Sequence, residues 1–170
     1  GNSRTFDNVI RRELNISEGD PVFKNQTQII SKKLKSLNLF ETVEVTQKET
    51  DNNMVNINIK VKEKQTGTVN AGVSVGTLDG FSVLAGLSER NFYGTGRSLN
   101  ALVNTSEDKT ELTFETSNRS SYINDLNLSY KVNYKEQDFS RVASYNLNSF
   151  SSGIGVSYKL NKKIRHAIDL

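Results

Sequence analysis

The most constraining feature of this sequence is an alternation of apolar and polar residues with a period of two. Residues 66–78 read TGTVNAGVSVGTL, and in an extended chain Val69, Ala71, Val73 and Val75 share one face. The small and polar residues between them share the other face, which is the pattern of a strand with one apolar side. The same alternation recurs to the end of the chain, whereas the earlier residues include stretches with helical spacing. The pattern predicts two domains, residues 1–64 and residues 65–170.

The first domain is predicted to begin with a helix over about residues 6–14, capped by Thr5. The sequence EGDP at residues 18–21 ends it, because glycine is conformationally permissive and proline restricts the residue before it. The apolar residues at helical spacing, expected to face a core, are Phe6, Val9, Ile10 and Leu14.

A second helix is predicted over about residues 26–37, where Asn25 and Gln28 resemble a capping box. A hairpin follows, with a polar turn at Asp51-Asn52-Asn53 between two alternating segments. The apolar residues of these three elements are Ile30, Leu34 and Leu37 on the helix, and Val43, Val45, Val55, Ile57, Ile59 and Val61 on the strands. Because an isolated hairpin is marginally stable, we expect a further strand before Gly1.

The second domain is predicted to hold six strands and the start of a seventh. Tight turns are expected at Asp79-Gly80 and Gly94-Thr95-Gly96, and longer polar connections at residues 117–125 and 135–146. The predicted strands are 66–78, 81–90, a segment around 99–103, 110–116, 126–134, 147–160 and an unfinished one from residue 164.

Two interpretations of this second domain remain open from the residues alone. No apolar run approaches the roughly 18 residues of a membrane-spanning helix, but a transmembrane β-barrel needs only every second residue to face lipid. Since such a barrel has at least about eight strands, it would have to continue beyond Leu170. The alternative is a soluble sandwich or small barrel that buries Val69, Phe81 and Tyr130 in a core.

The first domain resembles a POTRA domain. The resemblance rests on the segments GNSRTFDNVIRREL, EGDPVF, LKSLNLFETVEV and VNINIKVKEK, which occur in this order. It implies a β-α-α-β-β fold, and therefore also a strand before Gly1. The motif residues are Gly1, Asn2, Thr5, Val9, Ile10, Arg11, Arg12, Glu13, Glu18, Gly19, Asp20, Leu39 and Phe40.

The second domain resembles the start of the barrel in the family of outer-membrane protein assembly factors. The segment GVSVGTLDGFSVLAGLSERNFYGTGRSLNALVN carries this resemblance, including the turn at residues 91–96. Together the two resemblances imply the last POTRA domain of a tandem array followed by an antiparallel transmembrane β-barrel, here incomplete with about six or seven strands. They imply a location in the bacterial outer membrane, with the POTRA domain in the periplasm.

The family resemblance implies ATP-independent insertion of unfolded client β-barrel proteins into the outer-membrane lipid bilayer. It implies that Arg11 and Glu18 dock an accessory periplasmic lipoprotein, and that the first strand borders a lateral seam where client strands are templated. The seam residues are Thr68, Val69, Asn70, Ala71, Gly72, Val73 and Ser74. The alternative within the same architecture is a two-partner secretion or translocation-and-assembly transporter.

Catalysis and nucleic-acid binding have little support in the composition. The sequence has one histidine, His166, and no cysteine, so a zinc site or a catalytic triad lacks its usual residues. The net charge of +3 comes from scattered residues without a basic stripe. We therefore expect no enzymatic activity, no cofactor and no metal. The absence of a leader and the interrupted strand at 164–170 suggest a fragment of a longer protein.

Overall fold

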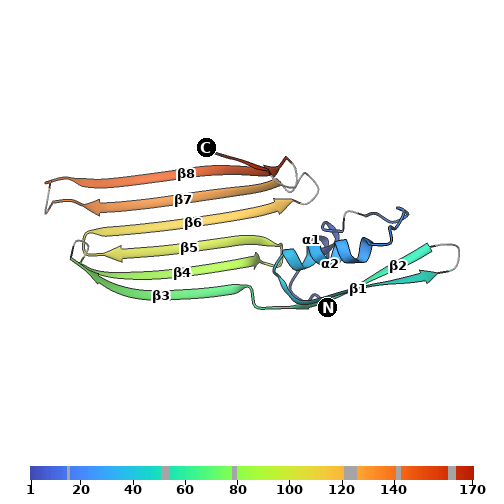
Figure 1. The fold of residues 1–170 in the computed structure, drawn as a ribbon. Coiled ribbons are helices and arrows are strands. Elements are labelled where there is room, and N and C mark those ends of the chain that lie inside the picture. Colours follow the sequence, from blue (N-terminus) through green and yellow to red (C-terminus); the bar gives the residue numbers. More distant parts are fainter. Residues whose placement is uncertain (15, 51–53, 78–79, 121–125, 141–142, 161–163) are drawn as a thin grey trace.

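The computed structural model describes residues 1–170 except 15, 51–53, 78–79, 121–125, 141–142 and 161–163. Two helices and a two-stranded sheet lie at one end of a larger seven-stranded sheet, next to the ends of β4 and β5 (Figure 1). The predicted turn at Asp51-Asn52-Asn53 and the first residue of the predicted Asp79-Gly80 turn fall outside the described residues. None of the described helices has the length and apolar character needed to cross a membrane.

The smaller domain contains α1 (Asp7–Arg11), α2 (Gln26–Ser36), β1 (Phe40–Thr50) and β2 (Met54–Glu63). The strands pair antiparallel, with Val43 opposite Val61 and Val45 opposite Ile59, so their apolar residues share the face toward the helices. The helical spacing predicted the helix side of this core correctly, apart from Phe6. Its buried members are Val9, Ile10, Ile30, Leu34, Leu39, Phe40, Val43 and Val61.

The predicted cap of the first helix is wrong, because α1 begins one residue late and its N-cap is Phe6 rather than Thr5. Asn25 is the N-cap residue of α2 as predicted, but neither helix has a side-chain capping bond. Thr5 is instead buried, at 3% exposed, and its hydroxyl accepts a hydrogen bond from Asn91 of the larger sheet. Phe6 therefore lies before the first helical turn and is 55% exposed rather than in the core. The Thr5 hydroxyl, which the local sequence predicts to cap the helix, instead forms a tertiary hydrogen bond.

The larger sheet has the strand order β3-β4-β5-β6-β7-β8-β9, and every neighbouring pair is antiparallel. This confirms an α+β domain followed by an antiparallel sheet. The strands are β3 (Gly67–Gly76), β4 (Gly80–Phe92), β5 (Arg97–Ser106), β6 (Lys109–Ser120), β7 (Leu126–Asp138), β8 (Asn146–Lys159) and β9 (Arg165–Asp169).

Several strands are longer than the alternation predicted. Residues 117–120 and 135–138 were expected in loops but belong to β6 and β7, where Asn118 pairs with Leu128 and Lys135 with Ser149. The connection between β7 and β8 is accordingly shorter than expected. The physical reason is that the backbone ladder continues wherever a neighbouring strand offers hydrogen-bond partners, even after both side-chain faces have become polar.

Candidate functional site

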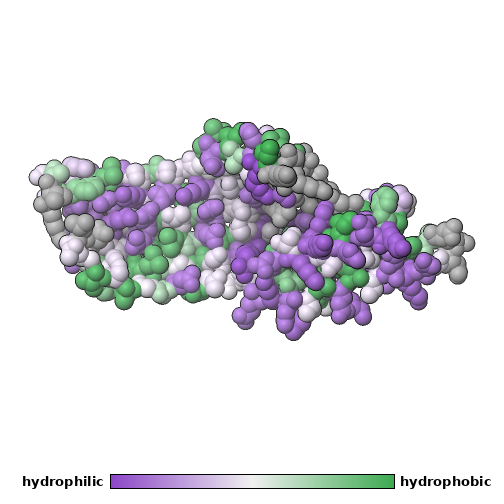
Figure 2. Space-filling model, viewed as in Figure 1, coloured by the Kyte–Doolittle hydropathy of each residue, from purple (hydrophilic) through white to green (hydrophobic). Residues whose placement is uncertain are grey.

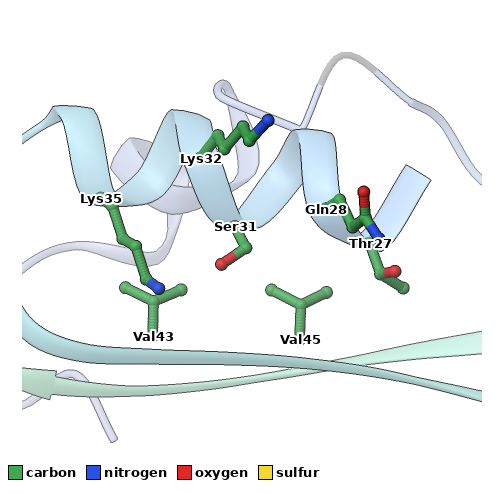
Figure 3. Close-up of a pocket in the computed structure, with 7 residues that line it drawn as sticks. All are labelled: Thr27, Gln28, Ser31, Lys32, Lys35, Val43 and Val45. Atoms are coloured by element: carbon green, nitrogen blue, oxygen red, sulfur yellow. The ribbon is translucent and has the colours of Figure 1, made fainter. Parts of the chain in front are cut away.

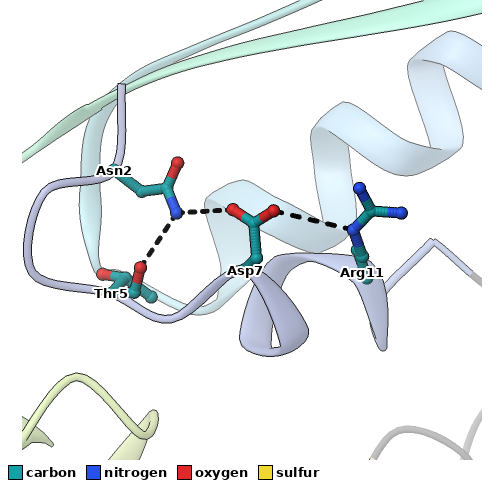
Figure 4. A network of polar contacts seen from close by, with 4 residues as sticks. All are labelled: Asn2, Thr5, Asp7 and Arg11. Atoms are coloured by element: carbon teal, nitrogen blue, oxygen red, sulfur yellow. Dashed lines mark hydrogen bonds and ion pairs between the residues drawn. The ribbon is translucent and has the colours of Figure 1, made fainter.

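The first predicted docking residue, Arg11, lies at the end of α1 with its side chain 69% exposed. Its Nε lies 3.7 Å from Oδ2 of Asp7, one helical turn earlier. Oδ1 of Asp7 accepts a hydrogen bond of 2.8 Å from Asn2, whose amide also donates to the Thr5 carbonyl (Figure 4). Asp7 thus orients Arg11 through one nitrogen of the guanidinium, while the side chain remains mostly in solvent.

The second predicted docking residue, Glu18, is exposed in the turn after α1. Within the described part of the chain, no ion pair or hydrogen bond joins it to Arg11, so the two predicted docking residues are not in direct contact. The neighbouring charges behave differently. Glu13 is 2% exposed, and its Oε1 lies 3.8 Å from Nε of Arg12, whose side chain is also largely covered. Of the Arg-Arg-Glu run, only Arg11 has a side chain that is mostly exposed to solvent.

Sequence reasoning missed a groove between α2 and β1. It has a volume of about 410 Å³, and Val43 and Val45 form its floor beneath the polar side of the helix (Figure 3). β1 pairs only with β2 among the described strands, so its other edge is open. The signal available in the sequence was the run of polar residues on α2 that faces this edge. The groove is lined by Thr27, Gln28, Ser31, Lys32, Lys35, Val43 and Val45.

The predicted seam residues all lie on β3, which is one edge of the larger sheet. Every residue of β3 is exposed, and Val69 reaches 78%. β3 is held on one side only, by its ladder to β4 and by a 2.6 Å hydrogen bond between the hydroxyls of Ser74 and Ser82. Within the described residues, the outer edge therefore offers unpaired main-chain donors and acceptors.

Most apolar residues of the larger sheet form one continuous face, and Leu84 and Leu102 lie on the opposite one. Val73 is opposite Val83 on β4, and further along the sheet Phe114 is opposite both Ala101 and Val132. These side chains are exposed rather than packed in a core, and Leu99 is the only buried apolar residue among the described positions of this sheet. Phe81 is 51% exposed and Tyr130 46% exposed. The soluble alternative predicted the opposite, so the described part of the sheet contains no core of that kind.

The other face of the sheet is polar. Asn133 donates to the hydroxyl of Thr113 at 2.9 Å and to the carboxylate of Glu111, which also pairs with Lys109 at 2.7 Å. Lys131 lies opposite Glu115. Figure 2 shows hydrophilic residues gathered over the middle of the visible face of the sheet. The sheet therefore separates an apolar surface from a hydrogen-bonded polar one.

A half-buried carboxylate contact holds the start of the chain against the end of β2. Glu63 accepts hydrogen bonds from the backbone N–H groups of Ser3 (3.0 Å), Arg4 (3.0 Å) and Thr5 (2.6 Å). Burial raises the pKa of Glu63, but the hydrogen bonds from Thr5, Arg4 and Ser3 outweigh it and lower the pKa to about 2. The carboxylate is therefore ionised at neutral pH and acts as a fixed acceptor.

The described residues contain no group of three His, Cys, Asp or Glu side chains that could hold a metal ion. His166 lies on β9 opposite Tyr158, with the two rings 5.9 Å apart. The chemistry available is recognition through charge, strand edges and an apolar surface.

Known proteins resemble this chain both over residues 1–64 and over most of its length. Residues 1–64 match the model of the family POTRA, described as a surface antigen variable number repeat. The chain is 27% identical over 165 residues to the outer membrane protein assembly factor BamA of Buchnera aphidicola, covering 95% of the chain and 27% of that protein. It is 35% identical over 100 residues to BamA of Nitratidesulfovibrio vulgaris, covering 56% of the chain and 12% of that protein.

Solved structures show the same fold. Haemophilus ducreyi BamA lacking POTRA domains 1–3 superposes with a TM-score of 0.79 at 24% identity, over 99% of this chain and 33% of that one. CdiB from Acinetobacter baumannii superposes with a TM-score of 0.57 at 17% identity, over 93% of this chain and 32% of that one. The chain spans about a quarter of the Buchnera relative's length and about a third of each of these two structures.

Proposed function

Because this chain belongs to the BamA family of outer membrane protein assembly factors and its first domain is a POTRA domain, we propose that it is part of a machine that inserts β-barrel proteins into the outer membrane. The family places it in the bacterial outer membrane, with the POTRA domain in the periplasm. In this proposal residues 1–64 form the last POTRA domain, and residues 65–170 form the first strands of the barrel. Insertion uses neither ATP nor a cofactor, and the chain has no enzymatic role.

The observation that carries the proposal is the exposed apolar face that runs across all seven strands of the larger sheet. A contiguous apolar surface that crosses seven strands marks a contact with a partner or a membrane. An antiparallel sheet can stay in lipid only if every backbone group is paired, so it must close into a barrel. The open edges of β3 and β9 support a barrel that continues with further strands.

The edge of β3 is the proposed site of client templating. A strand edge with unpaired N–H and C=O groups can add an incoming strand by β-augmentation. Gly72 has no heavy atom within 4 Å of its Cβ position and contributes no side chain to packing, which suits a strand held weakly against its neighbour. Hydrogen bonding on one side only would let this edge exchange its closing strand for a client strand.

The POTRA domain is the proposed receiving side. Arg11 and Glu18 would dock an accessory periplasmic lipoprotein, since a mostly exposed guanidinium can pair bidentately with a carboxylate. The groove beside the open edge of β1 offers unfolded client segments a polar wall and an apolar floor. Both relatives matched by sequence above are named assembly factors, so the related export transporters are the less favoured alternative.

A disulfide between β3 and the strand that closes the barrel tests this proposal. Cysteines at Asn70 and at the facing position of the closing strand, in the full-length protein, would lock the seam. We expect the oxidised protein in lipid vesicles to lose client insertion and the reduced protein to recover it. A matched bond between Asn70 and Gly86, which face each other within the β3–β4 ladder, should leave insertion unchanged. Full insertion with the seam bond verified by mass spectrometry would overturn the proposal.

A further inference from the structure

We propose that the turn of residues 91–96, between β4 and β5, is a second attachment of the POTRA domain to the sheet and sets the angle between the two. The covalent connection is short, since β2 ends at Glu63 and β3 begins at Gly67. A single connection of this kind would leave the domain free to swing about it. The turn would make the junction a two-point joint. This inference concerns the geometry of the chain and does not depend on which proteins it handles.

Hydrogen bonds cross from the turn to the start of the POTRA domain. The backbone N–H of Phe6 donates to the carbonyl of Gly94 at 2.9 Å. The side-chain amide of Asn91 donates to the hydroxyl of the buried Thr5 at 2.9 Å, while its carbonyl oxygen accepts from the N–H of Gly96 at 2.8 Å. Asn91 thus holds the turn in shape and ties it to the other domain with the same side chain.

The turn fits so closely that its glycines have no room for a side chain. Gly94 has φ of +73°, and a Cβ at this position would overlap the carbonyl oxygen of Arg4. Gly96 has φ of +69°, and its Cβ would lie 2.8 Å from Cγ1 of Val9 and 2.7 Å from Nη2 of Arg12. Backbone from one domain therefore packs directly on backbone from the other, which leaves little freedom for sliding.

The surface that receives the turn is itself fixed. Residues 3–5 are held to the end of β2 by the three backbone hydrogen bonds to Glu63. Val9 and Arg12, which contact Gly96, belong to α1 and its C-cap, and Val9 is 1% exposed in the core. A change in the angle would have to break the turn contact or distort this core. The same short helix carries Arg11 on its outer side, so the joint lies directly behind the proposed docking residue.

Distance measurements on the full-length protein in lipid vesicles test the joint. Two spin labels, at Lys35 on α2 and at Phe150 on β8, report the angle, both positions being exposed. We expect a single narrow distance distribution in the unmodified chain and a broadened or displaced one in Gly94→Ala. The matched control is Gly19→Ala, because Gly19 has φ of +90° but no atom within 4 Å of its Cβ position. It carries comparable backbone strain without touching the joint.

A second pair of variants tests the hydrogen bond from the Phe6 N–H to the Gly94 carbonyl by itself. Phe6 has φ of −66°, which proline adopts, so Phe6→Pro deletes only the N–H donor to Gly94 and the side chain. Phe6→Ala deletes the same side chain and keeps the donor. We expect Phe6→Pro to broaden the distribution and Phe6→Ala to leave it narrow, and this pair decides the matter if Gly94→Ala does not fold. A broad distribution in the unmodified chain, or an unchanged one in Phe6→Pro, would overturn the proposal.

Discussion

A lysine placed on the apolar face of the larger sheet should cost far more stability than one placed on the polar face. Phe114 and Thr113 are neighbours on β6 and point to opposite faces, because successive strand residues alternate. Phe114 lies near the middle of this 12-residue strand, is 45% exposed, and faces Ala101 and Val132. If that face meets lipid, Phe114 lies near the bilayer midplane.

The two substitutions have different expected costs. A lysine facing lipid near the midplane costs about 2–4 kcal/mol, which is roughly a 30-fold to 700-fold shift in the folding equilibrium. Thr113→Lys removes the hydroxyl that accepts a hydrogen bond from Asn133, a loss of about 0.5–1.5 kcal/mol, and leaves the charge on a polar face. The difference in unfolding free energy should therefore be about 0.5–3.5 kcal/mol in favour of Thr113→Lys.

Urea unfolding of the full-length protein in lipid vesicles, followed by the gel shift between folded and heated protein, measures this difference. We expect the unfolding midpoint of Phe114→Lys to fall well below that of Thr113→Lys. Phe114→Leu, which keeps the face apolar, separates loss of the ring from introduction of charge. Equal midpoints for the two lysine variants would show that the apolar face does not meet lipid, and the barrel proposal would then lose its main support.

Two further predictions concern the POTRA domain. Charge reversal in Arg11→Glu should weaken binding of the accessory lipoprotein by about tenfold or more, the effect of about 1.4 kcal/mol, because the new carboxylate would face the carboxylate of the partner. Lys24→Glu, an exposed charge reversal in the same domain, is the control. Equal loss of binding in both variants would argue against a specific role for Arg11. The Glu63 contact should weaken in acid: its pKa is lowered in the folded state to about 2 from an ordinary 4.5, so its contribution to stability is complete above about pH 4.5 and disappears as pH falls toward 2. The protection factor of the Thr5 amide, which compares its exchange with that of an unprotected amide at the same pH, should fall over that range in the native chain and be low throughout in Glu63→Gln; a protection factor that does not change with pH would contradict the assignment.

Local pattern predicted the elements of this chain well, and the places where it failed are informative. Period-two alternation located every strand of both sheets, and helical spacing placed Ile30 and Leu34 in the core. The Thr5 cap failed because Thr5 has a competing partner 86 residues away, which local sequence cannot reveal. The polar ends of β6 and β7 were assigned to loops, because a ladder depends on a neighbouring strand as well as on its own residues.

Some of the candidate sites were predicted from the sequence, and others became visible only in the structure. Arg11 and Glu18 were selected by resemblance, and their roles remain predictions. The structure adds that Asp7 orients Arg11 and that the adjacent Arg12 and Glu13 are directed inward. The groove between α2 and β1 was not predicted, because the space left between a helix and the strand that follows it depends on how the two pack, which local pattern does not show.

The sequence by itself determined the type of each element and which residues share a face, because these follow from side-chain periodicity along one strand or helix; the division at residue 65 remains a prediction from the same periodicity. Only the tertiary structure decided that the apolar face of the larger sheet is exposed, that β3 is its open edge, and that the turn at 91–96 seats on Arg4 and Val9. These features depend on which surfaces meet. The same glycine motif predicts a turn whether it lies in solvent or is pressed against another domain, and only the packed neighbour distinguishes the two.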